Sequence, residues 1–259
     1  FQMWAPDVYE GAPTPITGFL TGASKAAGFA VILRVFFVAL GNQAPLPVDW
    51  PALFAVLSAL TMTVGNLSAI PQANIKRMLA YSSIAHAGFI LVGVAAFSSQ
   101  GVGGVAYYLL GYMFTSMGAF AAIVAISERL GSDQIADYSG LARRAPLLAL
   151  ILAICLISLI GLPPTVGFVA KIYVFWAALQ QGLLWLVIFG VLNSVISAYY
   201  YLRVVKAMYL GAPASEDPLP VSRTLVVALA VAVIAILAIG LFPQPWLDFG
   251  ARAAVVVMP

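Results

Sequence analysis

Long apolar stretches recur along the whole chain, and short polar segments separate most of them. Each stretch reaches the roughly 20 residues that a helix needs to cross the hydrocarbon core of a membrane. The alternating segments of about ten residues that are typical of a transmembrane barrel do not occur in the sequence. The pattern therefore predicts an all-α, polytopic membrane helix bundle of about seven transmembrane helices, at residues 14–40, 51–70, 77–97, 103–128, 145–179, 183–209 and 221–243.

The fifth apolar stretch contains two adjacent prolines, Pro163 and Pro164, near its middle. Proline removes a backbone donor and clashes with the preceding turn, so the pattern predicts a broken helix here. Gly161 and Gly167 give the backbone freedom on either side. Broken helices form ion sites in transporters, because non-helical backbone at membrane depth must be buried in protein or line a wet cavity. An ordinary proline kink without a transport role is the alternative interpretation.

Composition agrees with a membrane protein and narrows its chemistry. The chain of 259 residues is 63% hydrophobic and 8% charged, with a mean hydropathy of +1.03, whereas a soluble domain has roughly 25% charged residues. The net charge of +3 does not indicate nucleic-acid binding, because the basic residues lie at helix ends rather than in one patch. The single cysteine, Cys155, allows no internal disulfide and no thiolate framework for zinc or an iron–sulfur cluster. We expect it to be a small buried apolar residue.

The basic residues of the loops predict the orientation of the bundle. On one side Arg252 is the only lysine or arginine. By the positive-inside rule the other side is expected to be cytoplasmic, and Trp50, Trp185 and Trp246 then fall at the opposite boundary, where aromatic anchors are common. The cytoplasmic connections hold Lys76, Arg77, Arg129, Arg143, Arg144, Arg203, Lys206 and Arg223.

Four basic residues lie inside the predicted spans rather than in loops, namely Lys25, Arg34, His86 and Lys171. An ionisable side chain at mid-bilayer costs about 2.5–3.5 kcal/mol on insertion scales and usually faces the bundle interior for a function. Arg34 lies near the outer end of its span, where an anchor that reaches the surface is the favoured interpretation. The one carboxylate in the predicted spans, Glu128, sits at a helix end, so this sequence offers no acidic proton site within the membrane.

Lys25 is the deepest of these residues in the first span. It lies about eleven residues from the start, too far to reach either surface easily. Its helical face is formed by small and hydroxylated residues that let helices or water approach the ammonium. We interpret it as a titrating lysine in a hydrated interior, and a structural lysine paired with a carboxylate is the alternative. The residues of this face are Gly18, Thr21, Gly22, Gly28 and Phe29.

His86 and Lys171 are the other two candidates. Ser82 and Ser83 precede His86 by one turn on the same face, and histidine suits a proton relay because its usual pKa is the closest to neutrality. A histidine that is simply hydrogen-bonded within the bundle remains an equal alternative. Lys171 follows the proline break by about two turns, and the combination of break and lysine is more specific than either feature alone.

Three segments, "WAPDVYEGAPTPITGFLTGASKAAGF" (4–29), "GNLSAIPQANIKRMLAYSSIAHAGF" (65–89) and "GLPPTVGFVAKIYVF" (161–175), occur in this order. They resemble the antiporter-like membrane subunits of respiratory complex I, over essentially the whole chain. In that family Lys25 matches a lysine on a central hydrated axis and Lys171 matches one that joins the axis to the outer side. Lysine at this second position favours the branch called subunit N or subunit 2, since sister subunits have glutamate. His86 matches a relay histidine, and Lys76 a basic residue whose place at the helix end favours anchoring.

The resemblance also implies an architecture. Members have fourteen helices in two inverted five-helix repeats, so residues 14–243 are expected to be helices eight to fourteen, the proton-translocating domain. Residues 1–13 are expected to be the end of a broken seventh helix with its loop, and residues 244–259 a short periplasmic tail. Because the chain starts at Phe1 without a signal peptide, we expect it to start inside a longer chain that holds the glutamate of helix five and the lysine of helix seven.

The function implied by the resemblance is proton translocation in a bacterial inner membrane. It would be coupled to quinone reduction in partner membrane subunits, and this chain would be a translocating subunit of the enzyme that performs no redox chemistry itself. NADH, FMN, iron–sulfur clusters and quinone are expected in those partners, and no cofactor, metal or nucleic acid on this chain. A subunit of a multi-subunit cation/proton antiporter is the alternative, and a structural module that does not pump is a third.

Overall fold

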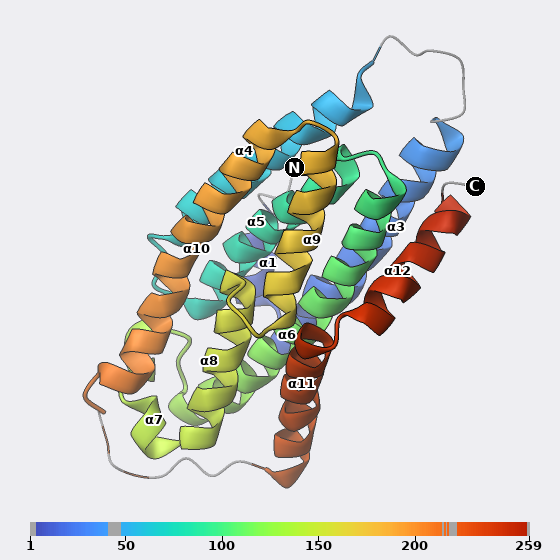
Figure 1. The fold of residues 1–259 in the computed structure, drawn as a ribbon. Helices are drawn as coiled ribbons and strands as arrows, with labels where there is room; N and C mark the ends of the chain where they lie inside the picture. The colour runs from blue at the N-terminus through green and yellow to red at the C-terminus, as the bar shows by residue number, and fades with distance from the viewer. Residues whose placement is uncertain (1–3, 41–47, 214, 216, 218–221, 258–259) are drawn as a thin grey trace.

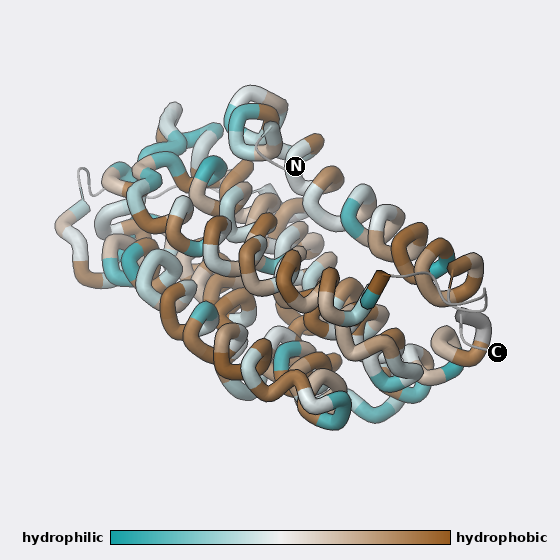
Figure 2. The backbone as a smooth tube through the Cα atoms, turned by 90° about the horizontal axis from the view of Figure 1, so that it is seen from above, coloured by the Kyte–Doolittle hydropathy of each residue, from teal (hydrophilic) through white to brown (hydrophobic). Residues whose placement is uncertain are grey.

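The computed structural model of the chain describes residues 4–40, 48–213, 215, 217 and 222–257. Their regular elements are helices, which form an elongated bundle (Figure 1). Six of the described helices are long and apolar enough to cross a membrane, and α8 (Pro146–Ile160) and α9 (Val166–Gln180) are shorter apolar helices. The predicted polytopic membrane helix bundle is therefore confirmed. Figure 2 shows hydrophobic residues along the helices and hydrophilic residues gathered toward their ends.

The first predicted span is one continuous helical stretch, Thr14–Ala39, preceded by the short helix α1 (Ala5–Gly11). Within the stretch two segments wind as a π-helix, and π turns in helices are frequent at functional sites. One of them ends immediately before Lys25. The parts in chain order are α2 (Thr14–Phe19), η1 (Leu20–Ser24), α3 (Lys25–Leu33) and η2 (Arg34–Ala39).

Helices α4 (Trp50–Ala69) and α5 (Ile75–Ala95) form a closely packed pair. Each starts at a side-chain cap, because Asp49 accepts from the backbone of Ala52 and Asn74 accepts from those of Lys76 and Arg77. The pair approaches closely at two glycines: a Cβ on Gly65 or on Gly88 would lie 2.6 Å from backbone nitrogen of the facing helix. Small residues permit such contacts between membrane helices.

Helix α6 (Ser99–Leu130) is 32 residues long and contacts α5, α8, α9, α11 and α12. Ser98 caps its start, and Gly131 ends it in the left-handed region with φ of 66°. After it come η3 (Ile135–Tyr138) and α7 (Leu141–Arg144), then the two halves of the predicted broken helix. Cys155 of α8 is buried, as expected, and its Sγ lies 3.0 Å from where a Cβ on Gly118 of α6 would be.

The predicted break in the fifth span is confirmed, since α8 ends at Ile160 and α9 begins at Val166. Gly161 ends α8 with φ of 85°, a conformation that favours glycine. At Gly167 a Cβ would collide with the carbonyl oxygen of Ser158, so α9 starts directly against the last turn of α8. The prolines therefore separate two half-helices (Figure 1), and Leu162, Pro163 and Pro164 of the break are themselves exposed on the described bundle.

The C-terminal helices differ from the predicted pattern. Helices α10 (Leu184–Leu210) and α11 (Arg223–Leu241) match predicted spans, but α11 is followed by α12 (Gln244–Val257), which packs along α6. The sequence predicts a short tail at residues 244–259, and the structure instead places a helix there. This helix lies close against α6: a Cβ on Gly250 would lie 2.7 Å from the carbonyl oxygen of Gly103. Residues 258–259 of the predicted tail, and 1–3 of the predicted first segment, lie outside the described residues.

Contacts at one end of the bundle hold the predicted cytoplasmic loops in place. Lys76 pairs with Asp133 at 2.8 Å, and the backbones of the two loops exchange hydrogen bonds, Ile75 N to Asp133 O at 2.9 Å and Ile135 N to Ala73 O at 2.8 Å. These contacts join the start of α5 to the loop after α6. They give Lys76 the structural role that its helix-end position suggests, and the sidedness of this end stays a prediction.

Candidate functional site

The three predicted site residues, Lys25, His86 and Lys171, meet along one face of α5, although only His86 belongs to this helix. Ser83, His86 and Phe89 follow one another at intervals of three residues on this helix. Lys25 of α3 contacts Ser83, and Lys171 of α9 lies over the ring of Phe89. His86 lies between these two contacts along α5. The fold thus brings Lys25, His86 and Lys171 together on one axis, although they are far apart in sequence.

Lys25 is held by α5 and α6. Its Nζ donates to the carbonyl oxygen of Ser83 at 2.7 Å and to Ser83 Oγ at 2.8 Å, and it lies 4.1 Å from the ring centre of Tyr112. Two glycines of this face lie against α6, since a Cβ on Gly18 would be 3.2 Å from Phe120 and one on Gly22 would be 3.1 Å from Met113, whereas a Cβ on Gly28 would have nothing within 4 Å. Lys25 is half-buried and has no acidic partner among the ion pairs of the described residues.

His86 has a hydroxyl on each ring nitrogen. Nδ1 lies 2.8 Å from the hydroxyl of Tyr108, and Nε2 lies 3.3 Å from that of Tyr201. The imidazole is 3% exposed. In a neutral imidazole one nitrogen donates and the other accepts, and tyrosine hydroxyls can do either. This arrangement therefore lets a proton enter the ring at one nitrogen and leave from the other.

Lys171 is buried at the helix break. Its Nζ donates to the carbonyl oxygen of Ile160 at 2.7 Å and to that of Leu159 at 3.3 Å, and it lies 4.4 Å from the ring centre of Phe89. The last carbonyls of a helix lack intrahelical partners and form the negative end of its dipole. Because α8 ends at Ile160, the break supplies these acceptors to the ammonium. The proline break and Lys171 are therefore one site.

Gly161 completes this lysine site. A Cβ at Gly161 would lie 2.9 Å from Cδ of Lys171, besides being strained at φ of 85°. The absence of a side chain lets the lysine pass beside the backbone and reach the end of α8. The glycine thus serves both the turn and the position of the ammonium.

A small cavity joins His86 to the break. About 10 Å³ of it is open to the centre of a water molecule, which is roughly what one water requires. Thr115 Oγ1 and Ser158 Oγ, 3.2 Å apart, give it polar groups. The residues around it are His86, Tyr108, Gly111, Tyr112, Thr115, Ser158, Leu159, Gly167 and Ala170. Since Leu159 also accepts from Lys171, one water here would connect the histidine side of the axis to the lysine at the break.

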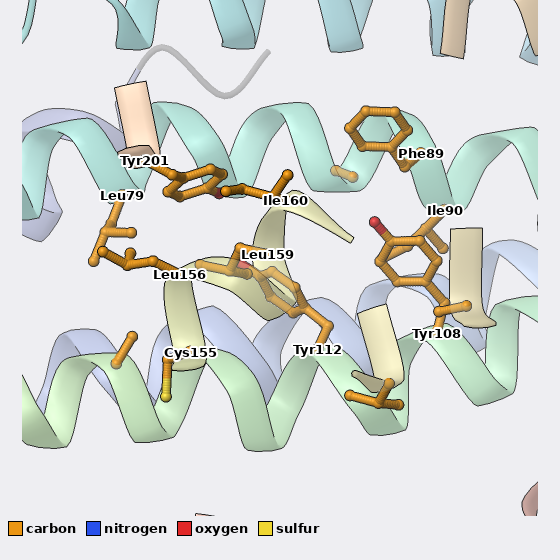
Figure 3. Close-up of a cluster of buried hydrophobic side chains, with 14 of the residues drawn as sticks. Leu79, Phe89, Ile90, Tyr108, Tyr112, Cys155, Leu156, Leu159, Ile160 and Tyr201 are labelled. Carbon is orange, nitrogen blue, oxygen red and sulfur yellow. The ribbon is translucent and has the colours of Figure 1, made fainter. Parts of the chain in front are cut away.

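The sequence did not indicate the aromatic residues of this site. Figure 3 shows Tyr108 and Tyr112 of α6, Tyr201 of α10 and Phe89 of α5 around the end of α8. Tyr108, Tyr112 and Thr115 recur at helical spacing, which was a usable signal for a polar face on α6. Tyr201 belongs to a run of three tyrosines at 199–201, and the sequence alone does not reveal which of them points inward.

The remaining basic residue of the four inside the predicted spans, Arg34, lies away from the axis. Arg34 is exposed at the start of η2, consistent with the anchoring role suggested by its place near the end of the span.

Among the residues that the structure describes, no group of three histidine, cysteine, aspartate or glutamate side chains could hold a metal ion. The polar chemistry of the described interior is that of ammonium, imidazole, hydroxyl, amide and carbonyl groups.

Comparison with known proteins supports the predicted resemblance. The family model described as "NADH:quinone oxidoreductase/Mrp antiporter, TM" matches residues 1–197. NADH-quinone oxidoreductase subunit N of Moorella thermoacetica is 52% identical over 256 residues, which cover 98% of this chain and 53% of that protein. A chain of respiratory complex I from Thermus thermophilus with bound aureothin has a TM-score of 0.80 and 36% identity, covering 95% of this chain and 53% of that one. A chain of the Mrp complex from Dietzia sp. DQ12-45-1b has a TM-score of 0.89 and 25% identity, covering 98% and 55%.

The matches extend over nearly all of this chain but over part of each relative. The chain spans about half the length of the curated relatives it matches. The family model covers more than half of the 259 residues, and the segments that predicted the resemblance all lie within the matched range. This chain belongs to the family of NADH:quinone oxidoreductase and Mrp antiporter transmembrane subunits.

Proposed function

We propose that this chain is part of a proton-translocating membrane subunit, subunit N, of a NADH:quinone oxidoreductase. The observation that carries the proposal is the axis on α5, where Lys25, His86 and Lys171 lie in order with hydroxyls and a water-sized cavity between them. Buried basic groups are costly in a membrane and usually mark an ion path. The 52% identity to a subunit of this name supports the proposal.

In this proposal a proton moves from Lys25 to Lys171. Lys25 releases it into the hydroxyl and water groups beside Ser83, His86 passes it from one ring nitrogen to the other, and water in the cavity delivers it to Lys171. The free carbonyls at the end of α8 stabilise the ammonium that forms there. When a further positive charge arrives on the axis, it repels this ammonium, and the repulsion promotes release of the ammonium proton.

The energy for translocation would come from partner subunits. NADH, FMN, iron–sulfur clusters and quinone are placed in those subunits by this proposal, and the chain itself moves protons without redox chemistry. The loops with Lys76, Arg143, Arg144 and Lys206 would face the cytoplasm of a bacterial cell, because basic loops favour that side of the inner membrane. Lys171 would then lead outward.

A subunit of a multi-subunit cation/proton antiporter is the second candidate. The structural similarity to a chain of the Mrp complex from Dietzia favours keeping it. The two functions differ in the partner subunits with which the chain would assemble. Co-purification with quinone-reducing subunits supports the first function, and co-purification with an antiporter set together with sodium-dependent proton exchange supports the second.

The test is Lys171→Ala in the full-length parent protein within its assembled complex. The variant removes the ammonium that the end of α8 binds, so we expect proton pumping and coupled NADH oxidation to fall strongly, measured in inverted vesicles with a pH-sensitive dye. Lys206→Ala is the matched control, because this exposed lysine lies outside the axis and its loss is expected to leave pumping unchanged. Normal pumping by Lys171→Ala would contradict the proposed function and favour a structural module.

A further inference from the structure

Helix α10 supplies one side chain to the proton axis that the proposed path does not use. The hydroxyl of Tyr201 lies 3.3 Å from Nε2 of His86 and is in hydrogen-bonding contact with Ser82 Oγ. Tyr201 is fully buried. Buried hydroxyls that contact both a histidine nitrogen and a serine can accept a proton from one and donate a proton to the other.

The two tyrosines on His86 differ in what lies behind them. Tyr108, on Nδ1, lines the water-sized cavity together with Ser158 and Leu159, on the side of the helix break. Tyr201, on Nε2, contacts Ser82, whose neighbour Ser83 accepts the hydrogen bonds of Lys25. The residues beside His86 are therefore ordered, with one hydroxyl toward Lys25 and the other toward Lys171.

We propose that Tyr201 is the relay residue through which protons reach His86 from the side of Lys25, an inference that rests on the proposed function. The hydroxyl of Tyr201 gives its proton to Nε2 while it takes one from the Ser82 side. His86 in turn releases the proton of Nδ1 to Tyr108, whose own hydroxyl proton passes to water in the cavity. Each tyrosine ends as it began and His86 keeps one proton on its ring, so one proton advances. The ring then returns to its starting tautomer before the next transfer.

A second buried hydrogen-bond network holds Tyr201 in place. The hydroxyl of Tyr200 donates to Asn66 Oδ1 of α4 at 2.9 Å, and Asn66 Nδ2 donates to Asn193 Oδ1 of α10 at 3.0 Å. Asn193 Nδ2 donates in turn to Thr63 Oγ1 at 3.2 Å. These bonds join α4 to α10 and fix the rotation of α10. A slip of one residue would turn the helix by about 100° and take the Tyr201 hydroxyl away from His86.

Tyr200 and Tyr201 provide a matched pair of variants. They are adjacent, both fully buried on α10 and both hydrogen-bonded through the hydroxyl. Replacing either with phenylalanine removes one oxygen atom and leaves the ring. Only Tyr201→Phe interrupts the contact with His86, whereas Tyr200→Phe removes one bond of the α4–α10 network.

The experiment measures protons pumped per NADH oxidised by the full complex that carries each variant, as a function of pH and in H₂O against D₂O. We expect Tyr201→Phe to lower pumping several-fold, with a changed pH profile and solvent isotope effect. Tyr200→Phe should lower pumping less and leave the pH profile and isotope effect unchanged, because the Asn66–Asn193–Thr63 bonds still join α4 to α10. Ser82→Ala, a smaller change at the other end of the same contact, is expected to lower pumping in the same direction. Native gel electrophoresis verifies that each complex assembles.

Two results would overturn the inference. Normal pumping by an assembled Tyr201→Phe complex would overturn it. Equal losses from Tyr201→Phe and Tyr200→Phe, with unchanged pH profiles, would also overturn it by assigning Tyr201 a structural role. Lys171→Ala, measured in parallel, separates this failure from that of the proposed function: if it lowers pumping while Tyr201→Phe does not, only the Tyr201 relay is wrong.

Discussion

Lys25 and Lys171 each donate to backbone carbonyl oxygen and lie over an aromatic ring, yet their surroundings differ. Lys25 is half-buried, and its acceptors are the carbonyl oxygen and the hydroxyl of Ser83 on the intact helix α5. Lys171 is 5% exposed and its acceptors are the free carbonyls at the end of α8. The first ammonium therefore depends on a hydroxyl and a carbonyl of an intact helix, whereas the second depends on the carbonyls of a helix end.

This difference shows how the fold holds two similar charges in two ways. An intact helix offers the ammonium few carbonyls, because most of its carbonyls bond within the helix, so Lys25 also uses the Ser83 hydroxyl. A helix end offers several free carbonyls and a negative dipole, so Lys171 needs no side-chain acceptor among the bonds of the described residues. The break is thus the feature that permits a deeply buried lysine.

Replacing each lysine with arginine tests the difference in enclosure and should give the largest effect. The guanidinium is larger and planar and cannot lose its proton, so we expect Lys171→Arg to abolish pumping and to lower assembly, because the buried site has no room for it. Lys25→Arg should also stop proton transfer but should lower assembly less than Lys171→Arg, since the Lys25 residue is less buried than Lys171. The measurements are the amount of assembled complex and pumping in vesicles. Equal assembly of both variants would contradict the difference in enclosure.

Gly161→Ala tests whether the break and Lys171 are one site. The added Cβ would meet the Lys171 side chain at 2.9 Å and adopt φ of 85°. Gly131 is the matched control, because its φ is 66° and a Cβ there would have nothing within 4 Å. Both variants should lose about 1–2 kcal/mol to backbone strain.

The two glycine variants should then differ in function. Gly161→Ala alone should displace Lys171 from the carbonyls of α8, with a further loss of thermal stability and of pumping. Thermal denaturation of the assembled complex and pumping in vesicles measure the two effects. If Gly131→Ala and Gly161→Ala gave the same stability and the same pumping, the contact between Gly161 and Lys171 would have no functional consequence.

Ser83→Ala should have the smallest effect on pumping. It removes one of the two hydrogen bonds of the Lys25 ammonium and leaves the backbone carbonyl, so we expect a loss of about 1.5–3 kcal/mol in stabilisation of that charge and a partial fall in pumping. Ser58→Ala is the control, since it removes a buried hydroxyl that donates to the Gly88 carbonyl at 2.7 Å without contacting the axis. A larger fall in pumping for Ser58→Ala would show that packing of α4 on α5 outweighs the Lys25 contact.

Much of the architecture could be predicted because membranes impose strict rules on sequence. Apolar length predicted the spans, and Pro163 and Pro164 predicted the break between α8 and α9. The segment 244–257 was not predicted as a packed helix, since the resemblance implied only a short tail there. Its position depends on the contact of Gly250 with Gly103, two glycines far apart in the chain. Hydropathy records how well a segment suits lipid and contains no information on such a contact.

The sequence by itself determined that the chain is a membrane helix bundle and that Lys25, His86 and Lys171 are its unusual interior groups, because charge and helix breakers in apolar stretches stand out residue by residue. Only the tertiary structure decided which groups surround them. Tyr201 meets His86 across 115 positions of sequence, and Lys25 meets Ser83 across 58. Such contacts depend on the packing and rotation of whole helices, and an ordinary tyrosine in an apolar stretch is equally suited to lipid, core or relay until that packing places it.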